Sequence, residues 1–270
     1  MTNKWEEHKI LIWGKTYPEL STSYFETVCT AGVLEDGRLI RLYPIPFRYL
    51  KDETVFKKFQ WIKAKIKKSQ SDPRPESYKI EPESIELLEF EKSDGKQWVN
   101  RANCVFKNKS IIYKTYDDLI KDYETKKISI GFVKPKSIDK VFIEEREAID
   151  YEKFQKKELQ ILEKSKQVSM FDLTQAEIKQ LDFLHHRFKV SWTCFDENCK
   201  GHLMTILEWE IYALARKIGY PKALERAKEL LNLTKFDIGF FLGNFRAHPN
   251  RFAIGSIWRP KKQQPTLFDL

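Results

Sequence analysis

Two cysteines and a histidine stand close together in the second half of the chain. Cys194, Cys199 and His202 lie within nine positions, and Gly201 permits a tight turn among them. Thiolate sulfur and imidazole nitrogen are the ligands that zinc prefers in a tetrahedral site. The spacing therefore predicts bound zinc, with His185, just before the preceding strand, as the candidate fourth ligand. Four protein ligands would make the site structural.

Other interpretations of this cluster stay open. His186, Cys29 or Cys104 could supply the fourth ligand once the chain folds. Water could fill that position instead, as in a catalytic Cys₂His zinc site, with Glu208 as the general base that activates the water. In a third interpretation, the two cysteines are small core residues and His202 caps the next helix.

A second group of polar residues could bind a hard divalent cation. Glu208 and Glu210 flank the apolar stripe of an expected helix, and Asp237 and His248 stand around a strand and the loop that leaves it. Carboxylate oxygens suit Mg²⁺ or Mn²⁺, and a histidine base beside them is what a metal-dependent nuclease requires. These four residues are the catalytic candidates of the alternative function, a nuclease. The competing interpretation is that the carboxylates pair with lysine or arginine at the edge of a core.

Other catalytic patterns are missing from the sequence. It contains no phosphate-binding loop, no dinucleotide-binding glycine fingerprint and no serine in a nucleophile elbow. Nucleotide hydrolysis by a phosphate-binding loop and hydride transfer are therefore not expected.

The charge of the chain points to a polyanionic partner. Lysine and arginine number 48 against 39 aspartate and glutamate, a formal net charge of +9 in 270 residues. Basic residues interleave with a tryptophan on the expected strands and loops, a combination suited to phosphate contact and base stacking. The nucleic-acid-binding candidates are Lys15, Arg38, Arg41, Arg48, Trp61, Lys63, Lys65, Arg74 and, from the second half, Arg246. The alternative is a solvated β surface with Trp61 in the core.

The expected elements of residues 1–146 are mostly strands. The clearest pattern is a hairpin of residues 27–34 and 38–43, joined by Asp36 and Gly37, which suit a tight turn. Further strands are expected at residues 8–13, 59–66, 97–106, 128–133 and 141–143, and one helix at residues 116–123. We therefore expect a mainly β, barrel-like domain over residues 1–146, a candidate nucleic-acid reader.

The rest of the chain mixes helices and strands. Residues 147–166 are charged, with apolar residues at near-helical intervals, so residues 147–180 are expected to be a helical connector and linker. Residues 181–260 are expected to be a smaller α+β domain that carries the Cys/His cluster. Its elements are a strand at 187–193, helices at 203–218 and 221–233, and paired strands at 236–242 and 251–258. The fold class of the whole chain is thus α+β.

The last ten residues, 261–270, follow Pro260 and are expected to be a flexible tail. Gln264, Leu267 and Phe268 in this tail resemble the short peptide by which prokaryotic replication and repair proteins hold the DNA sliding clamp. In such a peptide, glutamine fits a polar subsite while leucine and phenylalanine anchor in an apolar pocket. Residues 167–173, in the expected linker, contain a second and looser copy. The resemblance implies recruitment to DNA by the clamp.

These observations together favour one function over two others. No apolar stretch reaches the roughly 18 residues of a membrane span, and the first residues lack the apolar core of a secretory signal, so a cytoplasmic protein without a membrane partner is expected. The preferred function is DNA binding in prokaryotic or phage DNA metabolism, in repair, modification sensing or defence. The alternatives are the metal-dependent nuclease and an adaptor or RNA-binding module.

Overall fold

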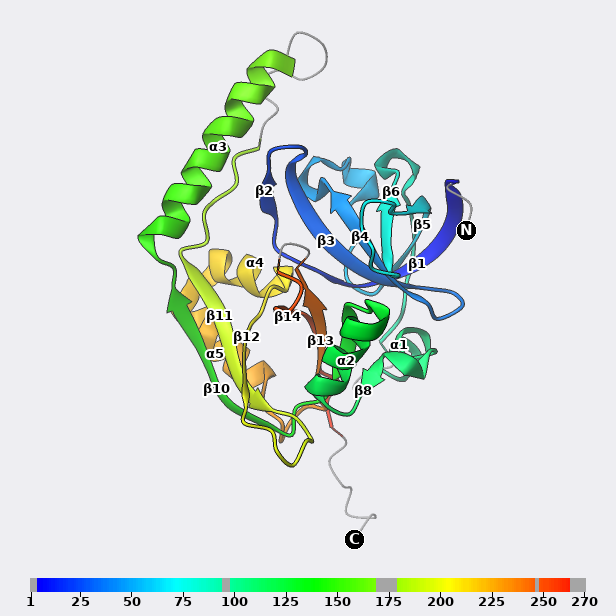
Figure 1. The fold of residues 1–270 in the computed structure, drawn as a ribbon, viewed down its shortest axis with the longest axis vertical. Helices are drawn as coiled ribbons and strands as arrows, with labels where there is room; N and C mark the ends of the chain where they lie inside the picture. The colour runs from blue at the N-terminus through cyan, green and yellow to red at the C-terminus, as the bar shows by residue number, and fades with distance from the viewer. Residues whose placement is uncertain (1–3, 94–97, 169–178, 246–247, 263–270) are drawn as a thin grey trace.

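The computed structural model describes residues 4–93, 98–168, 179–245 and 248–262. Its N-terminal part is a closed five-stranded β-barrel (Figure 1). Strand β5 pairs with β1 to close the barrel, and only β4 and β6 run parallel. Around the barrel the order is β1 (Glu6–Lys15), β3 (Phe25–Leu34), β4 (Leu39–Ile45), β6 (Ser77–Ile80) and β5 (Gln60–Lys68). Outside it, β2 (Glu19–Ser21) pairs with β3, and β7 (Glu86–Phe90) pairs with β5.

Local sequence explains the barrel strands. The chain turns between β3 and β4 at Asp36 and Gly37, and Gly37 has a φ of +90°, which glycine adopts without strain. Along β5, Ile62, Ala64 and Ile66 are buried while the intervening lysines are more exposed. Alternate side chains therefore fill the barrel, as the period of a β-strand requires. The expected barrel-like β domain is confirmed.

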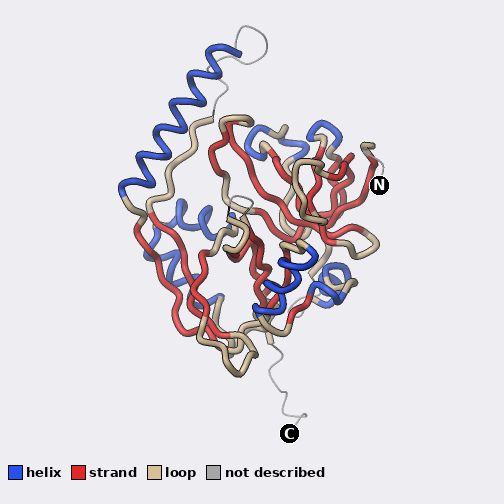
Figure 2. Tube along the Cα trace, viewed as in Figure 1, coloured by secondary structure: helices blue, strands red, loops and turns tan. Residues whose placement is uncertain are grey.

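The chain from residue 112 onward contributes two further sheets. The first has the order β14 (Phe252–Trp258), β13 (Gly239–Asn244), β9 (Ile130–Val133) and β8 (Ile112–Tyr113). The second has the order β10 (Ser137–Glu145), β11 (His186–Thr193) and β12 (His202–Thr205). Figure 2 shows these strands beside the helices of the same part. The predicted α+β class is confirmed.

Five α-helices lie in the described residues. They are α1 (Val99–Val105), α2 (Tyr116–Lys126), α3 (Ala148–Val168), α4 (Trp209–Ile218) and α5 (Tyr220–Leu230). Short 3-10 helices lie at Phe47–Tyr49, Asp52–Thr54, Pro82–Ser84 and Lys109–Ile111. In Figure 1, α3 extends away from the rest of the molecule. None of the helices in the described residues is both long and apolar enough to cross a membrane.

The barrel and the C-terminal part share a hydrophobic core. Trp13 of β1 stacks on Phe241 of β13 with ring centroids 4.1 Å apart, and both belong to one buried cluster. The Ser256 hydroxyl of β14 lies 3.0 Å from the Trp13 carbonyl. A Cβ atom on Gly14 would lie only 2.7 Å from the Ser256 Cβ, so glycine is needed where the two strands approach. The two parts are therefore packed against each other directly.

Two expected elements differ in the structure. Residues 99–105 form helix α1 instead of a strand, because Ala102, Val105 and Phe106 recur at helical spacing against the shared core. Residues 202–205 form strand β12, and the following helix begins only at Trp209. Met204 is buried while Leu203 is 59 % exposed, an alternation typical of a strand.

Strand pairing also shows which segments belong together. β9 pairs with β13, and β10 pairs with β11, so residues 112–145 are part of the C-terminal sheets. The division expected from the sequence lay later, at residue 146. The difference arises because short strand patterns do not reveal which sheet a strand joins.

Candidate functional site

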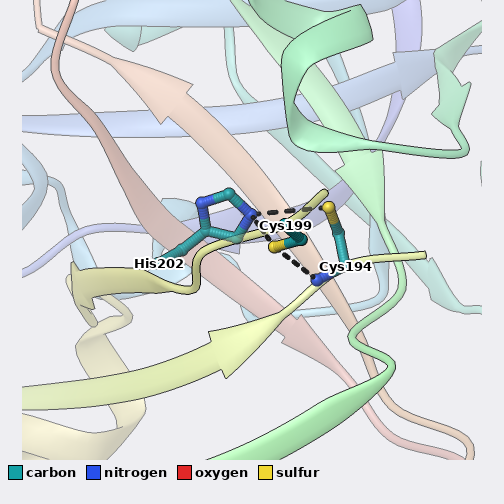
Figure 3. A group of neighbouring side chains, drawn as sticks. All are labelled: Cys194, Cys199 and His202. Atoms are coloured by element: carbon teal, nitrogen blue, oxygen red, sulfur yellow. Dashed lines mark hydrogen bonds between the residues drawn. The ribbon is translucent and has the colours of Figure 1, made fainter. Parts of the chain in front are cut away.

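The Cys/His cluster lies where β11 leads into β12: Cys194 and Cys199 are in the connecting loop, and His202 is the first residue of β12 (Figure 3). His202 Nε2 is 3.5 Å from the Cys194 sulfur and 3.2 Å from the Cys199 sulfur, and all three ligand atoms lie within 4.8 Å of one another. With Zn–S bonds of about 2.3 Å and a Zn–N bond of about 2.1 Å, a tetrahedral site separates sulfur from nitrogen by roughly 3.6 Å. The cluster therefore has the donor set and the spacing of a site that could hold a metal such as zinc.

Backbone amides surround the two sulfur atoms. Burial raises the pKa of the Cys194 thiol, and the backbone of Tyr116 and Asp196 opposes that shift. The Cys194 amide donates to the Cys199 sulfur over 3.4 Å, as drawn in Figure 3. Hydrogen bonds to a charged group stabilise its charged form, so these amides favour the thiolate that binds a metal. Tyr116 begins α2, so the cluster also ties that helix to the β11–β12 loop.

Burial governs the protonation of the cluster. The His202 ring packs against Tyr116 and Trp192, with ring centroids 4.9 and 4.6 Å away. This burial lowers the pKa of His202, although the nearby Asp117 carboxylate opposes the shift, so the imidazole is neutral and able to bind a metal. Burial also raises the pKa of the Cys194 thiol. Its thiolate would therefore be stabilised by a cation placed beside it.

His185 does not join the cluster, contrary to expectation. It precedes β11, whereas Cys194 follows the last residue of that strand, so the two lie at opposite ends. At about 3.3 Å per residue, the strand separates them by more than 20 Å. His185 instead contacts the rings of Tyr151 and Phe183. In the described residues, the group that could hold a metal therefore has three protein ligands.

The structure also places the other side chains considered as a fourth ligand. His186 packs against Tyr220 with ring centroids 4.7 Å apart, at the same end of β11 as the preceding histidine. Cys29 belongs to β3 of the barrel, and the Cys104 sulfur on α1 lies 3.6 Å from a Glu91 oxygen. None of them belongs to the metal-type group found in the described residues.

Glu208 is buried between the barrel and the C-terminal part. It precedes α4, is 6 % exposed, and forms an ion pair with Lys58 of the barrel. Its Oε1 also accepts hydrogen bonds from Ser256 Oγ over 2.8 Å and from the Ile257 amide over 3.2 Å. Burial raises the pKa of this carboxyl, but the Lys58 ammonium and these hydrogen bonds outweigh it and bring the pKa below its usual range. Glu208 thus has structural partners and lies outside the Cys/His cluster.

The other catalytic candidates lie apart from one another. Glu210 is 3.2 Å from the Lys15 ammonium, both carboxylate oxygens of Asp237 lie 2.8 Å from the Lys134 ammonium, and His248 is exposed. In the described residues, no metal-type group of three ligand atoms includes any of them. The ion pairs agree with the competing interpretation, in which these carboxylates pair with lysines at the edge of a core.

Several nucleic-acid-binding candidates of the N-terminal part contact acidic side chains. The Trp61 indole donates to a Glu91 oxygen over 3.0 Å. The basic candidates in ion pairs there are Lys63 with Glu7 and Glu86, Lys65 with Glu81, Arg38 with Asp36, and Arg48 with Glu26. Arg246 lies outside the described residues, as do the clamp-type residues Gln264, Leu267 and Phe268.

A cavity of about 710 Å³ lies between the barrel and the C-terminal part. The remaining nucleic-acid-binding candidates line it: Lys15, Arg41 and Arg74. Aromatic side chains also line it, and Tyr24 and Tyr43 among them are exposed. Eight basic residues line the cavity: Lys15, Arg41, Arg74 and Lys79 from the barrel, and Arg146, Lys153, Lys157 and Arg187 from the C-terminal part. The four acidic residues are Glu19, Asp72, Asp150 and Asp182.

One wall of the cavity is a buried network of polar side chains. Arg41 donates through Nη1 to the Asn244 carbonyl over 3.1 Å, and through Nη2 to the Ser129 carbonyl and hydroxyl over 3.1 and 3.0 Å. Arg74 binds Asp72 through two nitrogens and reaches the Asn244 side chain over 3.1 Å. Burial raises the pKa of Asp72, but the Arg74 guanidinium outweighs it and lowers the pKa to about 2. The wall therefore joins the barrel to β13.

Sequence reasoning missed Glu76 and Ser129, which complete this wall. Glu76 is 7 % exposed, and its Oε1 accepts a hydrogen bond from the Ser129 amide over 2.7 Å. Neither residue belongs to a motif that the sequence analysis identified, and 53 positions of the chain separate them. Ser129 is a single polar residue within the expected strand of residues 128–133, and Glu76 lies outside the expected strands, so neither gives a signal that identifies a site.

Comparison with protein families divides the chain in the same way as the strand pairing. Residues 112–270 match the model of a family described as "Domain of unknown function (DUF8757)", more than half of the chain. The chain belongs to the DUF8757 family. Residues 6–107 match a second model, "Domain of unknown function (DUF8758)". The DUF8757 part holds the Cys/His cluster, and the cavity lies between the two matched regions. A search of curated proteins gave no match.

Proposed function

We propose that the protein binds DNA in prokaryotic or phage DNA metabolism, in repair, modification sensing or defence, and that the cavity between its two parts receives the DNA. The composition of the cavity carries this proposal: eight basic residues face four acidic ones, and exposed tyrosines stand among them. Its volume of about 710 Å³ suits a nucleotide-sized group, since ligand pockets measure roughly 300–1,000 Å³. Basic and aromatic side chains together suit phosphates and bases.

Part of the positive charge in the cavity has no carboxylate partner. Arg146 and Arg187 share Asp150, whereas none of the described carboxylates lies within ion-pair distance of Lys79, Lys153 or Lys157. Lys153 and Lys157 are exposed and stand four residues apart on α3, on the same face of the helix. These lysines are therefore available for DNA phosphates.

Replacing two of these lysines tests the proposal. We expect the Lys153→Ala/Lys157→Ala variant to bind fluorescein-labelled 20-mer DNA about tenfold more weakly, with a salt dependence reduced by one to two phosphate contacts. The matched control is Lys63→Ala/Lys65→Ala, which removes the same charge from ion-paired positions outside the cavity. Fluorescence anisotropy with single- and double-stranded probes measures both. Intact protein that binds neither probe, or equal weakening in both variants, would overturn the proposal.

Within this function, zinc bound at Cys194, Cys199 and His202 would be structural. Arg187, near the start of β11, lines the cavity, whereas Cys194 follows the end of that strand. The rise of a β-strand puts them roughly 23 Å apart, too far for a bound metal to act on a group in the cavity. Zinc would instead stabilise the contact of the β11–β12 loop with α2, since metal binding is coupled to folding.

The clamp-type tail would recruit the protein to DNA. This part of the proposal rests on the resemblance of Gln264, Leu267 and Phe268 to clamp-binding peptides. Deleting residues 263–270 should abolish capture by an immobilised prokaryotic sliding clamp, while a Lys261→Ala/Lys262→Ala variant should be captured as well as the intact chain. Unchanged capture after the deletion, or no capture of the intact protein, would reject this role for the tail.

The nuclease alternative receives no comparable support. Glu208, Glu210 and Asp237 each pair with a lysine, and the described residues contain no group in which their oxygens converge. We therefore carry DNA binding forward as the proposed function.

A further inference from the structure

One face of three neighbouring barrel strands forms the floor of the cavity. The strands β3, β4 and β6 follow one another around the barrel, and the residues through which they line the cavity alternate with residues of the barrel core. On β4, Arg41 and Tyr43 line the cavity, while Ile40 and Leu42 are buried inside the barrel. The lining residues of the other two strands are Thr27, Cys29, Ala31, Ser77 and Lys79. Because successive side chains of a strand point to opposite faces, the cavity lies against the outer face of the barrel.

An exposed aromatic ring stands on this face. Tyr43 is 43 % exposed, and its hydroxyl lies 3.3 Å from the hydroxyl of Thr27 on β3, a contact that ties the ring to the floor of the cavity. A second tyrosine, Tyr24, directly precedes β3, is 46 % exposed and lines the same cavity. Exposed aromatic rings of this kind are the surfaces on which proteins stack the bases of nucleic acids.

Positive charge lies beside the rings. Arg41 and Ser77 are paired across β4 and β6, and Tyr43 and Lys79 each stand two residues further along these neighbouring strands, on the same face. Lys79 is one of the cavity lysines without a carboxylate partner in the described residues. The other two, at positions 153 and 157, line the cavity from α3 in the C-terminal part. The phosphates next to a base stacked on Tyr43 would thus meet lysines from both parts of the protein.

The exposed rings indicate which form of DNA fits the cavity. In a duplex, neighbouring base pairs cover both faces of each base, so a tyrosine reaches only the edges of the bases and the backbone. A single strand leaves the faces of its bases free, and stacking on tyrosine then adds to the phosphate contacts. The size of the cavity agrees: about 710 Å³ lies within the roughly 300–1,000 Å³ of pockets for small ligands, so the space suits individual nucleotides of a strand better than a whole duplex.

We propose that single-stranded DNA crosses this cavity, with unpaired bases stacked on Tyr43 and Tyr24 and the adjoining phosphates at Lys79, Lys153 and Lys157. The proposal rests on the proposed function and names the form of DNA that is bound. Attraction to phosphates alone favours the duplex, because each contact with duplex DNA releases more counterions than a contact with a single strand. A preference for the single strand therefore reports base stacking and not positive charge.

Comparing single-stranded with duplex DNA tests this directly. The probes are a fluorescein-labelled 20-mer without self-complementary stretches and the same 20-mer annealed to its complement, and fluorescence anisotropy measures binding. We expect the wild-type protein to bind the single strand about tenfold more tightly, a factor that the stacking of one base can supply. Tyr43→Ala should lose this preference without changing the affinity for the duplex, whereas Tyr43→Phe, which keeps the ring, should retain it. The matched control is Phe90→Ala, because Phe90 on β7 is 46 % exposed but does not line the cavity.

The outcomes separate this proposal from the function on which it rests. Binding of neither probe would remove the proposed function as well. If the wild-type protein binds the duplex as tightly as the single strand, or if the preference survives in Tyr43→Ala, the single-strand site is overturned while DNA binding stands. Equal losses in Tyr43→Ala and Phe90→Ala would also overturn the site. Circular dichroism checks that each variant is folded, and Tyr24→Ala, at the second exposed ring, is an independent variant that should weaken single-strand binding alone.

Discussion

Replacing Glu208 with glutamine should destabilise the whole protein. Glu208 belongs to the C-terminal part, and its carboxylate holds Lys58 of the barrel while accepting hydrogen bonds from Ser256 and Ile257. Glutamine keeps the size of the side chain and removes its charge. The Lys58 ammonium would then remain in the interface, with its side chain 18 % exposed and without its counter-charge. The substitution thus tests whether the contact between the two parts depends on this ion pair.

The structure sets the size of the effect. Removing one partner of a buried ion pair costs about 3–5 kcal/mol. Lys58 keeps the Ile257 carbonyl at 3.1 Å and some contact with water, so we expect about 3 kcal/mol for Glu208→Gln. With an unfolding entropy of about 2.1 cal/mol/K per residue, a chain of this length that unfolds as one unit would melt about 5 °C lower.

The pH dependence distinguishes loss of the ion pair from loss of packing. The pKa of Glu208 in the folded protein lies below its usual value of 4.5, because Lys58 and the hydrogen bonds outweigh the effect of burial. The stability that the ionised carboxylate contributes is therefore fully present above pH 4.5 and is lost as the pH falls through the folded pKa. The difference in unfolding free energy between wild type and Glu208→Gln should be constant near pH 7 and should narrow below about pH 4.5.

Urea unfolding, followed by tryptophan fluorescence at pH values from 7 to 3, measures this difference. Glu81→Gln is the matched control, because Glu81 is also paired with a lysine, Lys65, but the two side chains are 39 % and 53 % exposed. We expect the control to lose less than about 1 kcal/mol. Equal losses in the two variants, or a loss in Glu208→Gln that stays the same at pH 3, would refute the reasoning.

Two further predictions concern the metal site and the cavity wall. Metal analysis should find about one zinc per chain. The Cys199→Ser variant should lose this zinc and melt at a lower temperature, while the control Cys104→Ser, on α1, should keep it. Fully folded protein without metal would contradict the site. At pH 7, Asp72→Asn should lower the free energy of unfolding, measured with urea, by about 1–2 kcal/mol. The reason is that pairing with Arg74 lowers the pKa of Asp72 to about 2, while solvent screening reduces the effect on stability. That difference should shrink between about pH 4 and pH 2, and a difference unchanged at pH 2 would argue against the ion pair.

The barrel could be predicted because its signals are local. The turn at Asp36 and Gly37 and the alternation along β5 each depend on residues a few positions apart. The segment after His202 is one that local spacing did not predict correctly. Met204, Leu207 and Ile211 have the spacing of a helical face, yet residues 202–205 pair with β11 and become a strand. Pairing with a distant strand outweighed local spacing, as it does for many short apolar segments.

The candidate sites also differ in whether nearby or distant residues form them. The cluster of Cys194, Cys199 and His202 could be found from the sequence because all three ligands lie within nine positions of the chain. The expected fourth ligand, His185, precedes β11, and that extended strand separates it from the others. The cavity wall could not be found at all, since Arg41 meets an Asn244 carbonyl 203 positions away. Contacts of that separation exist only in the folded chain.

The position of the carboxylates decides which basic residues can serve a polyanionic ligand. Lys63 and Lys65 have an alternating strand pattern that suggested a basic surface, but Glu86 and Glu81 stand beside them in the folded barrel. Lys153 and Lys157, on a helix that the sequence assigned to a connector, have no such partner in the part of the chain that the structure describes. Under the proposed function, the net charge of +9 is the reason to expect a polyanionic partner, and the folded arrangement of acidic side chains is the reason to expect it at the cavity.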